Sequence, residues 1–127
     1  MKLGYLIVYV PDVAAAVAFY ERAFGLKRRF VHDGGQYAEM ETGATALAFA
    51  QEDFVTSNGI TFARNRPRDP AAGAEVGLVS ADVAASFATA VAAGALSVVP
   101  PMQKPWGQTV SYVRDCNGVL VEICSAM

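Results

Sequence analysis

The order of apolar and polar positions predicts the same succession of elements twice along the chain. In the first half, β-branched and aromatic residues over 5–10 predict a strand, and apolar residues at helical spacing over 13–24 predict a helix. Three more strand candidates follow, separated by glycine-containing turns. The second half repeats this order. The remaining predicted strands are 27–33, 35–41, 44–51, 75–80, 96–101, 109–115 and 119–124, and the second helix is 83–93.

Both predicted helices carry start and stop signals. Asp12 and Asp82 directly precede the first apolar helical residue, where an aspartate side chain caps free backbone N–H groups. Gly25 and Gly94 follow the last helical residues, where glycine commonly ends a helix. The two segments therefore correspond element by element.

The repeated order is βαβββ, which predicts an α+β fold of two modules with mixed sheets curled around a shared cleft. Three strands in a row favour hairpins over a doubly wound parallel sheet. We expect one domain of two repeated modules, about 1–52 and about 75–127, joined by a linker at about 53–74. A linker this long is typically functional, so we expect it to join the modules and cover a binding cleft.

Composition narrows the classes of protein. The chain has 127 residues, of which 54% are hydrophobic and 17% charged, so a packed core is expected. Its net charge of -2 and lack of a basic cluster predict no nucleic-acid partner. No stretch approaches the roughly 20 apolar residues of a membrane span, and no signal peptide is visible. Two cysteines make no disulfide framework, so we expect a cytoplasmic location.

One carboxylate interrupts the last predicted strand, "VLVEIC". By the two-residue period of strands, Glu122 shares a face with Leu120 and Cys124, opposite Val121 and Ile123. A buried carboxylate without a partner is costly. That face therefore meets water in a cleft, a ligand or a metal, and the sequence leaves these alternatives open.

Two segments resemble the vicinal oxygen chelate superfamily, which includes glyoxalases, bleomycin-resistance proteins and extradiol dioxygenases. They are "VYVPDVAAAVAFYERAFGL" near the start and "KPWGQTVSYVRDCNGVLVEIC" near the end. The resemblance implies two half-barrel modules around a cleft, and a homodimer. It also implies that four strand positions, filled by His, Gln or Glu, hold a divalent metal where one is present.

Carried onto this chain through the resemblance and the repeat, those four positions are Tyr5, Leu47, Glu75 and Glu122. Leucine cannot ligate a metal and neutral tyrosine is a poor ligand for Zn²⁺ or Ni²⁺. Two carboxylates remain, which suffice only for weak binding of a divalent ion such as Mg²⁺ or Mn²⁺. We therefore expect no cofactor. The single histidine, His32, also argues against a dioxygenase, because such iron sites use two histidines.

Aromatic residues complete the predicted site. Trp106, between Pro105 and Gly107, is either a core plug or a rigid wall on which a planar ligand stacks. Phe49 borders the linker and is either core or pocket lining. The predicted ligand-binding residues are Tyr5, Leu47, Phe49, Glu75, Trp106, Tyr112 and Glu122, with no catalytic residue assigned.

These features lead to a functional hypothesis with rivals. The preferred hypothesis is a metal-free homodimer that binds and sequesters a small, aromatic or antibiotic-like molecule, as in the bleomycin-resistance branch. The main alternative is a lyase or isomerase of the glyoxalase type, using a divalent metal on Glu75 and Glu122. A third hypothesis is metal-free acid–base chemistry by the same two carboxylates, which requires that their pKa values be driven apart.

Overall fold

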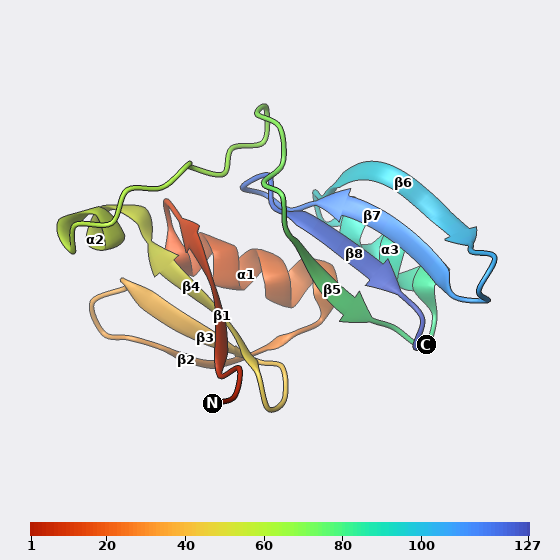
Figure 1. The fold of residues 1–127 in the computed structure, drawn as a ribbon, viewed down its shortest axis with the longest axis horizontal. Coiled ribbons are helices and arrows are strands. Elements are labelled where there is room, and N and C mark those ends of the chain that lie inside the picture. The colour runs from red at the N-terminus through yellow and green to blue at the C-terminus, as the bar shows by residue number, and fades with distance from the viewer. The chain divides into compact units, whose positions relative to one another are not determined.

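The fold was analysed in a computed structural model that describes all residues, 1–127. The chain divides into two compact units, Met1–Arg64 and Asn65–Met127, and each contains one βαβββ module (Figure 1). The fold class is α+β, as the sequence predicted. None of the three helices combines the length and apolar character that a membrane-crossing helix requires.

The first unit is a four-stranded mixed sheet with one long helix. Its strand order is β1-β4-β3-β2, with β1 parallel to β4 and the other neighbours antiparallel. A second, short helix follows β4 in the segment expected to be an irregular linker. The elements are β1 (Tyr5–Val10), α1 (Val13–Phe24), β2 (Lys27–Val31), β3 (Tyr37–Glu41), β4 (Ala46–Gln51) and α2 (Glu52–Ser57).

The second unit repeats this topology. Its strand order is β5-β8-β7-β6, with β5 parallel to β8, and α3 packs against β6, β7 and β8. The elements are β5 (Glu75–Val79), α3 (Val83–Ala92), β6 (Leu96–Gln103), β7 (Thr109–Arg114) and β8 (Leu120–Cys124). The doubled βαβββ order read from the sequence is therefore confirmed.

The N-caps of α1 and α3 and the C-cap of α1 are those that the sequence signals indicate, whereas α3 ends at Ala92 with Ala93 as its C-cap, one residue before Gly94. The Asp12 carboxylate accepts a hydrogen bond from the Ala15 N–H at 3.0 Å, and Asp82 does the same for Ala85 at 3.0 Å. Gly25 ends α1 in the left-handed region at φ 66°. These caps satisfy backbone groups that a helix end leaves unpaired, which fixes where each helix starts and stops.

Each helix covers one face of its sheet. In the first unit the ring of Phe49 in β4 lies 4.9 Å from that of Tyr20 in α1, and both side chains are fully buried. In the second unit the fully buried side chains of Val113, Val121 and Ile123 form the corresponding layer. We call the opposite side of each sheet its helix-free face. Since side chains alternate along a strand, Tyr5 and Glu122 lie on helix-free faces.

Part of the linker packs tightly against the second unit. The Arg114 guanidinium in β7 donates to the carbonyls of Gly118, Pro67 and Arg66 at 2.9, 3.2 and 3.1 Å. Gly118 lies directly under the Arg66 carbonyl. A methyl group on Gly118 would overlap the Arg66 oxygen and lie 2.6 Å from the Arg66 carbonyl carbon. Only glycine fits this position without moving the linker.

We predict that Gly118→Ala destabilises the protein more than Gly43→Ala. The two glycines have nearly equal φ values, 90° and 91°, but a methyl group on Gly43 meets nothing within 4 Å. The left-handed conformation alone should cost about 1–2 kcal/mol at either position. Overlap with the linker should add about 1–3 kcal/mol for Gly118. Urea unfolding measures both, and equal losses would contradict the tight packing.

Candidate functional site

The central pair of the candidate site joins two neighbouring strands of the second unit. Antiparallel pairing sets Tyr112 of β7 directly opposite Glu122 of β8 on the helix-free face. The Tyr112 hydroxyl donates a hydrogen bond to Glu122 Oε2 at 2.8 Å. Both side chains are half-buried. The tyrosine therefore fixes the position of the carboxylate that the sequence singled out.

Glu75 lies in β5, the neighbour of β8 on the side opposite β7, and is the third residue of the candidate site. In the parallel ladder, Glu75 of β5 faces Leu120 and Gly77 faces Glu122, so the missing side chain at Gly77 leaves room beside Glu122. The carboxyl groups of Glu75 and Glu122 interact, and each shifts the pKa of the other. Two carboxyl groups can share a hydrogen bond only while one of them carries a proton.

The two acids differ in their pKa values. Burial, the hydrogen bond with Glu122 and its negative charge raise the pKa of Glu75. Burial also favours the neutral form of Glu122, but the neighbouring Cys124 side chain, the hydrogen bond from Tyr112, the neighbouring Glu75 side chain and the charge of Lys104 outweigh it and lower the pKa of Glu122. Between these two pKa values, Glu75 holds the shared proton and Glu122 is the carboxylate.

The two other donors stay protonated at neutral pH. The hydrogen bond to Glu122, burial and the nearby negative charges raise the pKa of Tyr112 to about 12. Burial and the nearby carboxyl groups of Glu122 and Glu75 raise the pKa of the Cys124 thiol to about 11, and the thiol donates to the Leu78 carbonyl at 3.8 Å. Glu122 thus accepts a hydrogen bond from the neutral Tyr112 hydroxyl.

This polar cluster lies on a face that also presents exposed apolar side chains. Val79 follows Glu75 on the same face of β5, and its side chain is 69% exposed. Leu96 and Met102 of β6 lie opposite Arg114 and Val110 of β7 and are 57% and 50% exposed. The face therefore combines apolar area with a few fixed polar groups, the combination found in small-molecule sites.

The chemistry of the donor set limits what metal it can hold. The structure contains no group of three or more His, Cys, Asp or Glu side chains that could ligate one ion. Within the second unit the carboxylates that could ligate an ion are Glu75 and Glu122, and a metal binds carboxyl groups in their deprotonated form.

The first unit places its predicted residues differently. Tyr5 lies on the helix-free face and is 57% exposed. Leu47 and Phe49 are buried on the α1 side, because Phe49 packs on Tyr20 and Leu47 shares its face. Strand register makes Ala48, not Leu47, the counterpart of Glu122, since Tyr5 pairs with Ala46 as Glu75 pairs with Leu120.

A polar cluster on the first unit's helix-free face escaped the sequence analysis. Glu39 is only 7% exposed, accepts from the Tyr37 hydroxyl at 3.0 Å and pairs with Arg29 at 3.2 Å. Arg29 also binds both oxygens of Glu41, at 2.8 and 2.9 Å. The signal was the alternation in "YAEME", which puts these tyrosine and glutamate side chains on one face. Unlike Glu122, Glu39 is neutralised by an arginine.

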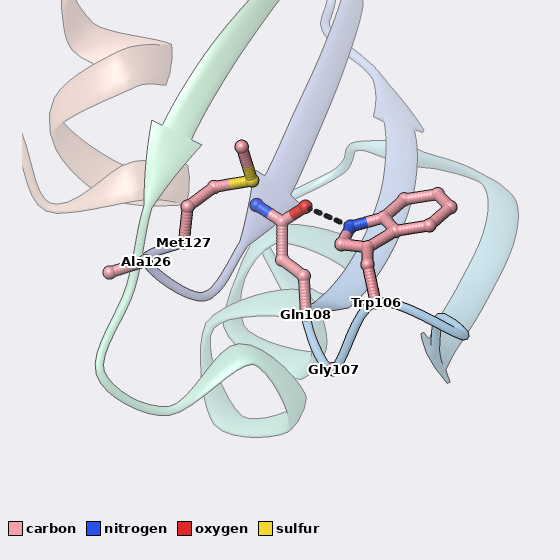
Figure 2. Close-up of a pocket in the computed structure, with 5 residues that line it drawn as sticks. All are labelled: Trp106, Gly107, Gln108, Ala126 and Met127. Atoms are coloured by element: carbon pink, nitrogen blue, oxygen red, sulfur yellow. Dashed lines mark hydrogen bonds between the residues drawn. The ribbon is translucent and has the colours of Figure 1, made fainter.

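Trp106 lines a hollow of its own. The hollow measures about 710 Å³ and is lined by Trp106, Gly107, Gln108, Ala126 and Met127 (Figure 2). The indole is 65% exposed, and its Nε1 donates to Gln108 Oε1 at 3.0 Å. The Gln108 amide in turn donates to the Ser125 carbonyl at 2.9 Å. Trp106 is thus an oriented surface aromatic rather than a core plug, and Glu75 and Glu122 do not line its hollow.

Two βαβββ units with mixed four-stranded sheets are the architecture of the glyoxalase fold. The model of the Glyoxalase/Bleomycin resistance protein/Dioxygenase superfamily matches residues 2–123, and the chain belongs to this superfamily. No curated protein sequence matches it. The resemblance read from the sequence is confirmed.

Solved structures share the fold at low sequence identity. A glyoxalase-related enzyme from Fulvimarina pelagi is 19% identical, with a TM-score of 0.83, over 99% of this chain and 88% of that one. TioX from Micromonospora sp. ML1 is 24% identical, with a TM-score of 0.75, over 100% of both chains. A glyoxalase/bleomycin resistance protein/dioxygenase family enzyme from Burkholderia phytofirmans PsJN is 16% identical, with a TM-score of 0.80, over 100% of both chains. At these identities the likeness establishes the fold alone.

We predict that the two carboxyl groups titrate on opposite sides of the ordinary glutamate pKa of 4.5. Carbon-13 NMR of the glutamate carboxyl groups measures both. Glu122→Gln should lower the pKa of Glu75, because the neighbouring charge is removed. Tyr112→Phe should raise the pKa of Glu122, because a hydrogen bond to its ionised form is lost. Ordinary titration of both groups in the wild type would refute the shared proton.

The raised pKa of Glu75 also predicts a pH dependence of stability. Folding favours its protonated form, so this contribution is complete below the ordinary pKa of 4.5 and is lost as the pH rises through the raised value. Glu75→Gln cannot ionise and should gain stability relative to the wild type across that window. Glu41, whose pKa Arg29 lowers through a hydrogen bond, is the control of opposite sign. Urea unfolding midpoints at several pH values measure the stability of Glu75→Gln and Glu41→Gln relative to the wild type. As the pH rises, this difference should increase for Glu75→Gln and decrease for Glu41→Gln.

Proposed function

We propose that this protein binds and sequesters a small molecule, without a metal, on the helix-free face of its second sheet. The supporting observation is the cluster of Glu122, Tyr112 and Glu75, which fixes a carboxylate among exposed apolar side chains. Such a surface binds by burial of apolar area, and the polar cluster orients the ligand. The arrangement favours a ligand with an apolar body and a hydrogen-bond donor or cationic group directed at Glu122.

The Trp106 hollow supports an aromatic ligand. Its indole is exposed yet oriented by Gln108, so a flat ring can stack on it at little cost in side-chain entropy. The proposal includes a homodimer, as the superfamily resemblance implies. The edge strand β1 leaves Tyr5, Leu6 and Ile7 exposed by 57, 44 and 44%, which favours a protein partner there. Neither Cys116 nor Cys124 forms a disulfide, which supports a cytoplasmic location.

A catalytic alternative rests on the same pair of acids. The pairing of β5 with β8 brings the carboxyl groups of Glu75 and Glu122 together, as a lyase or isomerase with a divalent ion would require. The same proximity, with one pKa raised and one lowered, also suits metal-free acid–base chemistry. We rank binding first because neither alternative explains the exposed apolar area around the pair.

A compound panel tests the proposal. Aromatic amines and peptide-like antibiotics, bleomycin among them, should include compounds that raise the melting temperature of the protein. Glu122→Gln or Tyr112→Phe should weaken binding of such a compound about tenfold or more, because a hydrogen bond to a charged group is lost. Glu21→Gln, which removes an exposed carboxylate on α1, is the matched control and should change nothing.

Metal analysis separates the rival functions. Protein purified without chelator should contain no stoichiometric Ni²⁺, Zn²⁺ or Mn²⁺. The binding proposal would fail if such a metal were present and lost in Glu122→Ala. Turnover of a glutathione hemithioacetal that depends on added metal would establish the lyase instead. Turnover that persists in chelator and disappears in Glu75→Gln would establish the acid–base alternative.

A further inference from the structure

The segment after α2 runs back along the first unit with few backbone hydrogen bonds. We define residues 60–64 as the strap. The turn before it is regular, because Asn58 and Gly59 donate backbone hydrogen bonds to α2 carbonyls. No backbone hydrogen bond holds residues 60–63. Side chains alone therefore keep this part of the chain in place.

Two side chains make those contacts. The Phe62 ring meets the Tyr9 ring edge to face, with centroids 4.9 Å apart. Tyr9 belongs to β1 and pairs with Ala50 on the helix-free face, so Phe62 covers that end of the face. Aromatic pairs of this geometry contribute beyond the area that they bury.

Arg64 fastens the far end of the strap. Its guanidinium forms an ion pair with the Glu52 carboxylate at 2.5 Å. The Glu52 side chain is only 3% exposed. The guanidinium carbon also lies 5.4 Å from the centre of the Phe62 ring. One arginine thus holds both a buried carboxylate and the ring that covers Tyr9. Removing that arginine should therefore loosen the whole strap.

We infer that residues 60–64 are a hinged cover on the first sheet, which opens around the Gly59 turn when Phe62 leaves Tyr9 and Arg64 leaves Glu52. Segments with exposed backbone and few buried contacts open at low free energy, without unfolding the core. Opening uncovers the Tyr9 end of the helix-free face of the first unit. This device goes beyond the proposed function, which concerns the second unit.

Proteolysis under native conditions tests whether the cover opens, because the protease must bind the Phe62 side chain before it can cut. Chymotrypsin binds Phe62 in its specificity pocket before it cuts the Phe62–Ala63 bond, so cleavage requires that the ring has left Tyr9. The Trp106–Gly107 bond is the internal reference, since Trp106 is already 65% exposed. In the wild type we expect slower cleavage after Phe62 than after Trp106. Both rates should be independent of urea below the unfolding transition.

Arg64→Ala should raise the cleavage rate after Phe62 about tenfold and leave the rate after Trp106 unchanged. Arg28→Ala is the matched control, because it removes another arginine–glutamate pair of the same unit, an exposed one with Glu21. Arg64→Lys retains the charge and should restore slow cleavage. Equal acceleration at both bonds, or none after Phe62, would overturn the inference. These readings need no ligand, so they stand apart from the test of the proposed function.

Discussion

A four-stranded sheet has two faces, and each unit of this protein has one long helix with which to cover them. α1 and α3 each bury the side chains on one face of their sheet, and no long helix covers the side chains on the other face. The remaining features of the protein follow from this uncovered face. The two polar clusters, the exposed apolar side chains around Glu122 and the strap all belong to the helix-free faces.

The two units solve the same problem with different chemistry. In the first, Glu39 is paired with Arg29 and nearly buried, so its charge is compensated within the sheet. In the second, Glu122 accepts a hydrogen bond from the Tyr112 hydroxyl and has no arginine partner. The carboxylate on the first face is therefore already paired with a positive charge. The carboxylate on the second face has neutral partners, and a ligand can replace one of them. This difference is why the proposed site lies in the second unit.

Much of the fold was predictable because local signals agreed with tertiary packing. Asp12 and Asp82 mark helix starts whatever surrounds them, and strand alternation placed Glu122 on the face opposite Val121 and Ile123. Register was less predictable. Two residues separate Gly43 from β4, whereas one separates Gly118 from β8, and that difference transfers the role assigned to Leu47 to Ala48. The partners of Glu39 also depend on which strands become neighbours, which no local pattern specifies.

The proton between Glu75 and Glu122 has a thermodynamic consequence for any guest that replaces it. Between the two pKa values, a ligand group that binds Glu122 frees Glu75 to ionise, and the released proton passes to the buffer. The observed binding enthalpy then contains the ionisation heat of whichever buffer is used. Heats measured at one pH in that range, in two buffers with different ionisation enthalpies, would differ in proportion to the protons released, so calorimetry can count the exchange at this site without a structure of the complex.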